Sequence, residues 1–405
     1  MSILLLIIIY LIFISLGVPD PFISSCWPTI SQAFDVSKDA QGIITIIASI
    51  CTILSSFFTV KLNKLLKPLG TVLISIALTC GGIFMCAYAN SFLMMCLACI
   101  PLGLGAGAID ATLNNYVAVN YKSIHLNWLH AFWGVGTIIS PLIIGGFLSN
   151  PDGWRTAGLV LGIIQGVILV ITACSSPVWL KVDKDFKLRE KEKETENKTE
   201  EKTIGFFKTF KLRGVILAII GFFCYCVVEQ TCYIWYSSML VFELNVSEDL
   251  AATWVSLFFI GLVVGRFLAG FVSLKISDKN MIRIGEGITL VGIILLMFTF
   301  NIYIMPVAVC LIGFGCAPIY PAIIHDTPNR FTKEYSASVM AVQVGCAYMS
   351  NITIVPLFGV VGDKTSFLAL PYVLLFFTII MIVANELVIV RTKDKTKLLT
   401  KLNKK

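Results

Sequence analysis

The chain has 405 residues, a formal net charge of +7, and 57% hydrophobic but only 14% charged residues. Soluble proteins carry about 25% charged residues, so this composition excludes an ordinary soluble domain. Mean hydropathy is +0.87, and the apolar residues form long blocks. We therefore predict an all-α integral membrane protein.

Twelve apolar stretches are each long enough for a helix that crosses about 30 Å of hydrocarbon. The predicted spans cover residues 2–24, 41–60, 69–89, 92–119, 127–149, 157–180, 214–241, 251–274, 282–301, 303–324, 335–360 and 368–391. The first stretch lacks a basic N-terminal region and an Ala-x-Ala cleavage site, so we expect a helix rather than a secretory signal. The sequence thus predicts twelve transmembrane helices.

Basic residues gather on one side of the predicted membrane. When the loops alternate between the two sides, 27 of the 31 Lys and Arg residues fall on the side that holds both termini. Because positive residues accumulate in cytoplasmic loops, we predict that both termini are cytoplasmic. The Lys- and Ile-rich composition is typical of an AT-rich bacterial source, which predicts the plasma membrane (cell inner membrane) as the location. The charge excess then reflects topology, and we expect no nucleic-acid partner.

A charged segment divides the chain into two halves. Residues 181–213 hold 11 basic and 8 acidic residues and have no apolar face to bury. We predict an N-terminal six-helix half over 1–180, a cytoplasmic linker over 181–213, a C-terminal six-helix half over 214–391 and a basic cytoplasmic tail over 392–405.

The two halves resemble each other weakly. Gly103-Leu-Gly105 followed by Asp110 aligns with Gly313-Phe-Gly315 followed by Tyr320. Repeated halves are typical of secondary transporters, in which the binding site lies near the bilayer midplane. We assign the glycines of both segments to close helix packing.

Asp110 lies inside the apolar run 92–119, where an ionisable group costs about 2.5 to 3.5 kcal/mol and usually faces a watery cavity or a partner. Asn114 follows four residues later, so it shares a helix face with Asp110 and can pair with it or with a sugar hydroxyl. His130 and Trp133 lie in the next predicted helix. We predict that these four residues bind substrate and that Asp110 also takes up and releases a proton. A structural hydrogen bond that locks two helices is the alternative.

The span 214–241 carries an acid, Glu229, near mid-depth, together with Tyr233 and Trp235. Aromatic faces beside hydrogen-bonding groups fit an amphipathic ligand such as a sugar. We predict that Glu229 takes part in proton coupling and that Tyr233 and Trp235 bind substrate. An interfacial aromatic belt is the alternative for Trp235.

Four further polar residues complete the predicted site. Gln343 and Asn351 are eight residues apart and so lie approximately on one helix face. Tyr320 lies in the segment that aligns with Asp110, and Asp20 stands between two prolines in the first span. We predict substrate contacts for Gln343, Asn351 and Tyr320, and a position facing the cavity for Asp20. Interhelical hydrogen bonds, or for Asp20 a place at the outer interface, are the alternatives.

The other intramembrane charges lie nearer the predicted cytoplasmic ends, where long side chains snorkel or form loop contacts. We assign none of them to substrate: Arg266, Glu286, His325, Asp326 and Glu386. The chain has no Walker A motif, no HExxH motif and only three His. We therefore predict no enzyme activity, no catalytic residue, no cofactor and no metal site.

Three segments resemble the major facilitator superfamily, and more narrowly its fucose-permease-type sugar:proton symporter branch. They are Gly103-Leu-Gly with Asp110-Ala-Thr-Leu-Asn114, then Leu126-Asn-Trp-Leu-His130-Ala-Phe-Trp-Gly134, and Gly315-Cys-Ala-Pro318 with Thr327-Pro-Asn-Arg330. The resemblance implies twelve helices in two pseudo-symmetric halves, a substrate role for Asp110 and a proton role for Asp20. The loop motif of the superfamily, Gly-x-x-x-Asp-Arg-x-Gly, lies between its second and third helices. The corresponding residues of this chain, 61–70, match the motif only in part and lack its acid.

We expect a monomeric secondary transporter that moves a small hydroxylated solute, such as a monosaccharide, inward with a proton by alternating access. Its expected partners are that solute, protons and the lipid bilayer. Gly136-x-x-x-Ser-Pro with Gly145-Gly146 resembles a drug-antiporter motif, so proton-driven efflux of lipophilic solutes is the alternative. A substrate-sensing receptor without transport is a third hypothesis.

Overall fold

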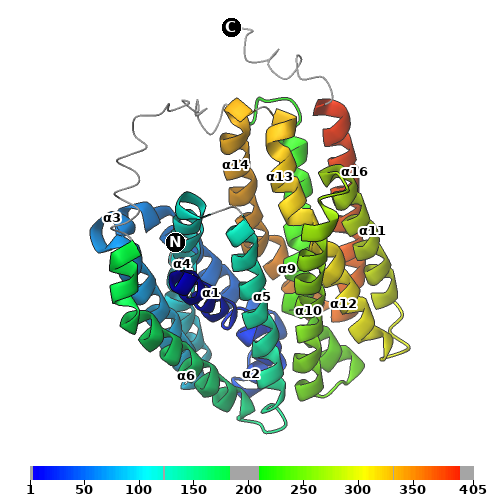
Figure 1. Cartoon of the computed structure of the whole chain (residues 1–405). Coiled ribbons are helices and arrows are strands. Elements are labelled where there is room, and N and C mark those ends of the chain that lie inside the picture. The colour runs from blue at the N-terminus through cyan, green and yellow to red at the C-terminus, as the bar shows by residue number, and fades with distance from the viewer. Residues whose placement is uncertain (1–2, 122–123, 183–208, 332, 393–405) are drawn as a thin grey trace. The chain divides into compact units, whose positions relative to one another are not determined.

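The computed structural model describes residues 3–121, 124–182, 209–331 and 333–392, which form helices and their short connections (Figure 1). The long helices of the first half are α1 (Ile3–Gly17), α2 (Phe22–Ala33), α3 (Gln41–Ala87), α4 (Phe92–Asn120), α5 (Ile124–Gly145) and α6 (Gly153–Cys174). Those of the second half are α9 (Val215–Leu244), α10 (Glu248–Val272), α11 (Asp278–Leu296), α12 (Ile304–Cys316), α13 (Ile319–Phe331), α14 (Lys333–Ile352), α15 (Ile354–Lys364) and α16 (Leu370–Thr392). Most of the predicted linker and the basic tail lie outside the described residues.

Ten helical segments among the described residues are long and apolar enough to cross a membrane. One of them contains α3, which turns back on itself at Lys67, where φ is 62°, directly before Pro68. Its first arm (residues 41–66) and second arm (residues 68–87) correspond to the second and third predicted spans. The ninth span corresponds to α11, whose four charged residues lower its hydropathy. The fold of twelve transmembrane helices is therefore confirmed.

Several spans are broken rather than continuous. The first span ends one helix at Gly17 and begins the next at Phe22, because Pro19 and Pro21 remove backbone donors and restrict the chain. The break thus lies in the middle of a 31-residue segment, Ile3–Ala33, and not near the far end of a shorter helix. The tenth span breaks between α12 and α13 beside Pro318, and the eleventh breaks at Thr353.

The glycines of the two aligned segments occupy equivalent packing positions. A Cβ on Gly103 would lie 2.3 Å from the first arm of α3, and one on Gly105 would lie 2.5 Å from the second arm. In the other half, a Cβ on Gly313 would lie 2.0 Å from α10, and one on Gly315 would lie 2.4 Å from α11. These approaches leave no room for a side chain, so the predicted packing role is confirmed, and the internal repeat extends to the helices that the glycines contact.

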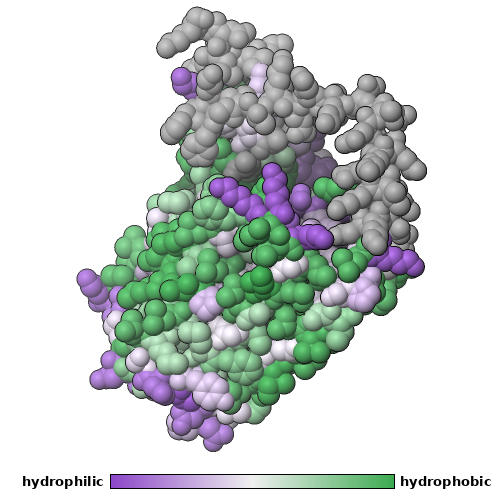
Figure 2. All heavy atoms as spheres, turned by 90° about the vertical axis from the view of Figure 1, so that its left-hand side faces the viewer, coloured by the Kyte–Doolittle hydropathy of each residue, from purple (hydrophilic) through white to green (hydrophobic). Residues whose placement is uncertain are grey.

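The helices group into two compact units. The first unit contains residues 1–198 and also Leu240–Ser256, which end α9 and begin α10; the second contains residues 199–239 and 257–405. Figure 2 views the side on which α3 and α6 lie in Figure 1, and there the surface is mainly apolar, with hydrophilic residues toward the upper and lower ends. Such a band fits a surface that faces lipid.

Candidate functional site

Asp20 stands in the break between α1 and α2, and its side chain is exposed although Val18 and Phe22 on either side are buried. The indole Nε1 of Trp133, in α5, donates a hydrogen bond of 2.8 Å to Asp20 Oδ2. The two helices come this close because Gly17 has no side chain: a Cβ there would lie 2.1 Å from the carbonyl oxygen of Trp133. The break and the glycine together place an acid from the first span against the fifth.

Asp110 and Asn114 meet as their spacing predicts, on one face of α4. Asn114 Nδ2 donates a hydrogen bond of 2.8 Å to Asp110 Oδ1, and both side chains are half-buried. The charge of Asp110 also acts on Asp20, so the two carboxyls lie in one electrostatic environment. The first unit therefore brings together two acids and two neutral N–H donors, all of them predicted site residues.

His130 lies one helical turn before Trp133 on the same side of α5. It is exposed, and its ring lies edge-on to Phe13 of α1, with the ring centroids 6.1 Å apart. The contact between the first span and α5 thus includes three predicted residues, namely Asp20, His130 and Trp133. All five predicted residues of the first half belong to the first unit.

Glu229 is buried within the second unit and faces Arg266 of α10, with 3.8 Å between Oε1 and Nη2. The sequence analysis placed Arg266 near the cytoplasmic end and gave it no role in the site. It lies only six residues before the end of α10, but its long side chain reaches the mid-depth acid. The sequence feature that could have revealed this pair is the single Arg inside an apolar run, because a charged residue in a membrane helix usually has a partner of opposite charge in a neighbouring helix.

The two aromatic residues after Glu229 have different surroundings. Tyr233 is half-buried, donates its hydroxyl to Gln230 Oε1 at 2.7 Å and packs against the Phe258 and Phe259 rings. Trp235 is fully buried, donates its indole N–H to the Val355 carbonyl at 2.9 Å and packs against other rings. Trp235 therefore has the contacts of a core residue, which the sequence analysis did not consider.

The remaining predicted residues of the second half lie at helix breaks or in a buried network. Tyr320 follows the break between α12 and α13 and packs against Phe222 and Tyr225. Asn351 precedes the break at Thr353, and its Oδ1 is buried without a hydrogen bond. Broken helices supply the binding residues of many transporters, so these positions, like that of Asp20, fit a ligand site.

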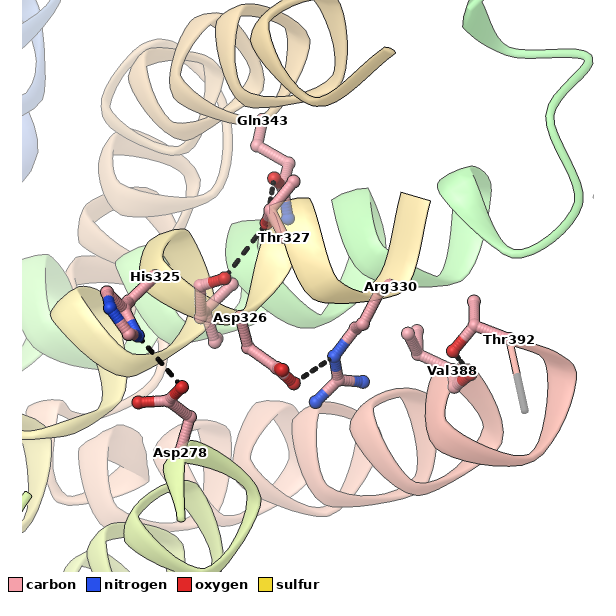
Figure 3. A network of polar contacts seen from close by, with 9 residues as sticks. Asp278, His325, Asp326, Thr327, Arg330, Gln343, Val388 and Thr392 are labelled. Atoms are coloured by element: carbon pink, nitrogen blue, oxygen red, sulfur yellow. Dashed lines mark hydrogen bonds and ion pairs between the residues drawn. The ribbon is translucent and has the colours of Figure 1, made fainter. Parts of the chain in front are cut away.

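Gln343 instead belongs to a polar network (Figure 3). Its Oε1 accepts a hydrogen bond of 3.1 Å from Thr327 of α13, and the side chain is buried. Nearby on α13, Asp326 pairs with Arg330, and His325 Nδ1 lies 2.9 Å from Asp278 Oδ2 of α11. These contacts join α11, α13 and α14, so Gln343 has a structural partner already.

The turn between α9 and α10 makes polar contacts within the first unit. Glu248 accepts a hydrogen bond of 2.6 Å from Thr29 and one of 3.3 Å from Gln32, both on α2. Lys38 Nζ lies 4.5 Å from the centroid of the Phe242 ring. Sequence analysis missed this contact because Thr29 and Glu248 are 219 residues apart.

Replacing Thr29 with Val is expected to loosen this turn. The substitution removes a hydrogen bond to a charged acceptor, which is worth about 1.5 to 3 kcal/mol. The fraction of molecules in which this turn has separated from α2 should therefore rise about tenfold or more. Cys26, fully buried and close to Glu248, reports the opening. A membrane-impermeant maleimide should label Cys26 faster in Thr29→Val, measured by peptide mass. Thr45→Val, which removes only a bond within α3, is the control; equal labelling rates in both variants would contradict the expectation.

Residues 3–242 and 219–405 match the family described as Major Facilitator Superfamily. The chain belongs to the major facilitator superfamily. The family and the fold are those of transporters and not of enzymes.

Two curated proteins are similar to this transporter. Glucose/mannose transporter GlcP of Bacillus subtilis is 20% identical over 366 residues, which cover 86% of each chain. Bypass of stop codon protein 6 of Saccharomyces cerevisiae is 25% identical over 292 residues. That match covers 67% of this chain but only 57% of the yeast protein, so the chain matches little more than half of that relative's length.

Solved structures share the fold at low sequence identity. A bacterial homologue of the human lysosomal transporter Spinster, in an inward-facing conformation, has a TM-score of 0.72 at 13% identity and covers 98% of this chain and 97% of its own. A D-xylose–proton symporter has a TM-score of 0.70 at 14% identity, with coverages of 97% and 98%. The xylose transporter XylE from E. coli, partially occluded and inward open, has a TM-score of 0.71 at 12% identity, with coverages of 94% and 97%.

Proposed function

We propose that this transporter carries a monosaccharide-like solute into the cell together with a proton, as a member of the fucose-permease-type branch. The observation that carries the proposal is the pair of carboxyls in the first unit, Asp20 and Asp110. Each accepts a hydrogen bond from one neutral donor, Trp133 or Asn114. No ion pair reaches either carboxyl among the described residues. An acid in a membrane without a cation is readily neutralised by a proton.

The same groups suit a hydroxylated ligand. A carboxylate and an amide oxygen accept hydrogen bonds from sugar hydroxyls, while an indole offers an apolar face to C–H groups. The similarity to a transporter named for glucose and mannose supports this solute class. The same similarity gives no support to efflux of lipophilic solutes. Efflux remains the second candidate only because the segment from Gly136 to Gly146, at the end of α5, resembles a drug-antiporter motif.

The test is a panel of monosaccharides supplied to proteoliposomes with an imposed pH gradient. Uphill uptake of one sugar, with alkalinisation of the external medium, is the expected result. Acidification of the external medium when lipophilic dyes enter, with no response to any sugar, would replace the proposal with drug efflux, because an antiporter exchanges each entering dye for a proton that leaves. A protein that binds a sugar but shows no counterflow would be a receptor and not a transporter.

A further inference from the structure

The first unit contains an apolar pocket of about 380 Å³ between the two arms of α3 and the middle of α4. Its lining includes Phe58 and Leu66 of the first arm, Ile74 of the second arm and Ala108 of α4. It contains none of the acids or amides of the candidate site. The pocket is therefore a separate feature of the molecule.

Two properties of this pocket fit an opening toward hydrocarbon. Phe58 is 51% exposed and Ile74 48% exposed, so its rim lies on the outer surface of the unit. Two of the three hydroxyls in its wall donate to backbone carbonyls of α3: Ser55 to Thr52 at 3.1 Å and Thr71 to Lys67 at 3.2 Å; the third, that of Ser75, is buried. Because two of these hydroxyls already donate to the backbone and the lining residues without a hydroxyl are apolar, the wall offers few groups to water, and an acyl chain fills such a space at lower free-energy cost.

Three cations stand at the turn between the arms that form the pocket. Lys61, Lys64 and Lys67 are all exposed, and residues 61–70 contain no acid. Lys61 Nζ lies 5.6 Å from the centroid of the Phe58 ring, which lines the pocket. The backbone carbonyl of Lys67 accepts a hydrogen bond from Thr71, another lining residue, so the backbone of Lys67 lies one helical turn from the pocket wall. The superfamily acid that would neutralise this turn is missing, so its positive charge is free to attract an anion.

An apolar slot that ends at a group of lysines matches the two parts of an anionic lipid. The positive residues at a predicted cytoplasmic turn attract anionic headgroups, and the slot takes one acyl chain. We propose that this pocket binds one anionic glycerophospholipid, with an acyl chain between α3 and α4 and its phosphate at Lys61 and Lys67. The bound lipid would fill the groove between the two arms of α3 and α4 and so stabilise the first unit.

Native mass spectrometry of the full chain, titrated separately with dioleoyl phosphatidylglycerol and dioleoyl phosphatidylcholine, tests the proposal. We expect one phosphatidylglycerol to remain bound under conditions that remove phosphatidylcholine. The variant Lys61→Gln/Lys64→Gln/Lys67→Gln should lose affinity for phosphatidylglycerol by about fivefold for each lysine that contacts the headgroup. A control variant, Lys181→Gln/Lys275→Gln/Lys279→Gln, removes the same charge from exposed positions that do not line the pocket and should retain the lipid.

A second variant tests the acyl-chain part of the site. Ala108→Met places a longer, flexible side chain into the pocket, so it should reduce lipid retention while all three lysines remain. Equal binding of the two lipids, or equal loss of lipid from both triple variants, would overturn the proposal in favour of non-specific attraction. Unchanged retention in Ala108→Met would likewise show that the pocket is not the site.

Discussion

Proteoliposomes that contain the Asp110→Asn variant are expected to lose proton-driven uphill uptake by about 100-fold or more, yet to keep substrate counterflow within a few-fold of the parent. Asn has the same shape as Asp, and its side-chain oxygen can still accept the hydrogen bond from Asn114 that the parent carboxylate accepts at 2.8 Å. Only the capacity to gain and lose a proton disappears. Counterflow exchanges substrate without net proton movement, so it separates coupling from binding.

Two comparisons sharpen this test. Asp20→Asn, made in parallel, identifies which carboxyl of the pair carries the proton, because its bond from Trp133 can also be kept. Asp363→Asn, at an exposed acid near the end of α15, removes the same charge from the surface and should leave uptake unchanged. Loss of counterflow in Asp110→Asn would assign the residue to substrate binding, and unaltered uphill uptake would remove it from the site.

The second large effect is expected in the second unit, where Arg266→Leu should destabilise the protein by about 3 to 5 kcal/mol. Glu229 and Arg266 have side chains only 10% and 19% exposed, so removing the cation leaves a buried carboxylate without its partner. The double variant Glu229→Leu/Arg266→Leu removes both charges and should recover much of this loss. Thermal unfolding of the purified variants in one detergent measures the difference.

An exposed ion pair provides the matched control. Asp152 lies 3.3 Å from Arg155, but its side chain is 84% exposed, so Asp152→Ala should change stability by less than about 1 kcal/mol. If the Arg266→Leu variant is no less stable than the Asp152→Ala variant, the buried ion pair contributes little to the stability of the protein. If the double variant is as unstable as the sum of its single variants, the two residues act independently.

The pair also changes the interpretation of Glu229. The sequence analysis treated it as a lone acid near mid-depth and proposed that it binds and releases a proton. Because Glu229 has a cationic partner 3.8 Å away, whereas no ion pair reaches Asp20 or Asp110 among the described residues, we propose that Glu229 holds α9 to α10 through Arg266. Proton coupling then rests on the carboxyls of the first unit.

The class of fold can be predicted from the amino-acid sequence alone. A membrane-spanning helix must satisfy every backbone polar group within itself and present about twenty apolar residues to lipid, and both requirements can be read locally along the chain. The alignment of Gly103 with Gly313 also predicted the internal repeat, because close helix packing needs small residues at fixed spacing. The pairing of Asp110 with Asn114 followed from the same helical spacing.

Contacts between polar groups that are distant in the sequence could not be predicted and are seen only in the folded protein. The contacts Asp20–Trp133, Glu229–Arg266 and Thr29–Glu248 each join helices that are separate in the sequence. Such contacts depend on the rotation and depth of each helix, and on breaks such as the one at Asp20, which hydropathy does not specify. The buried core position of Trp235 and the apolar pocket between α3 and α4 arise in the same way, since packing between helices is a property of the whole arrangement and not of any one segment.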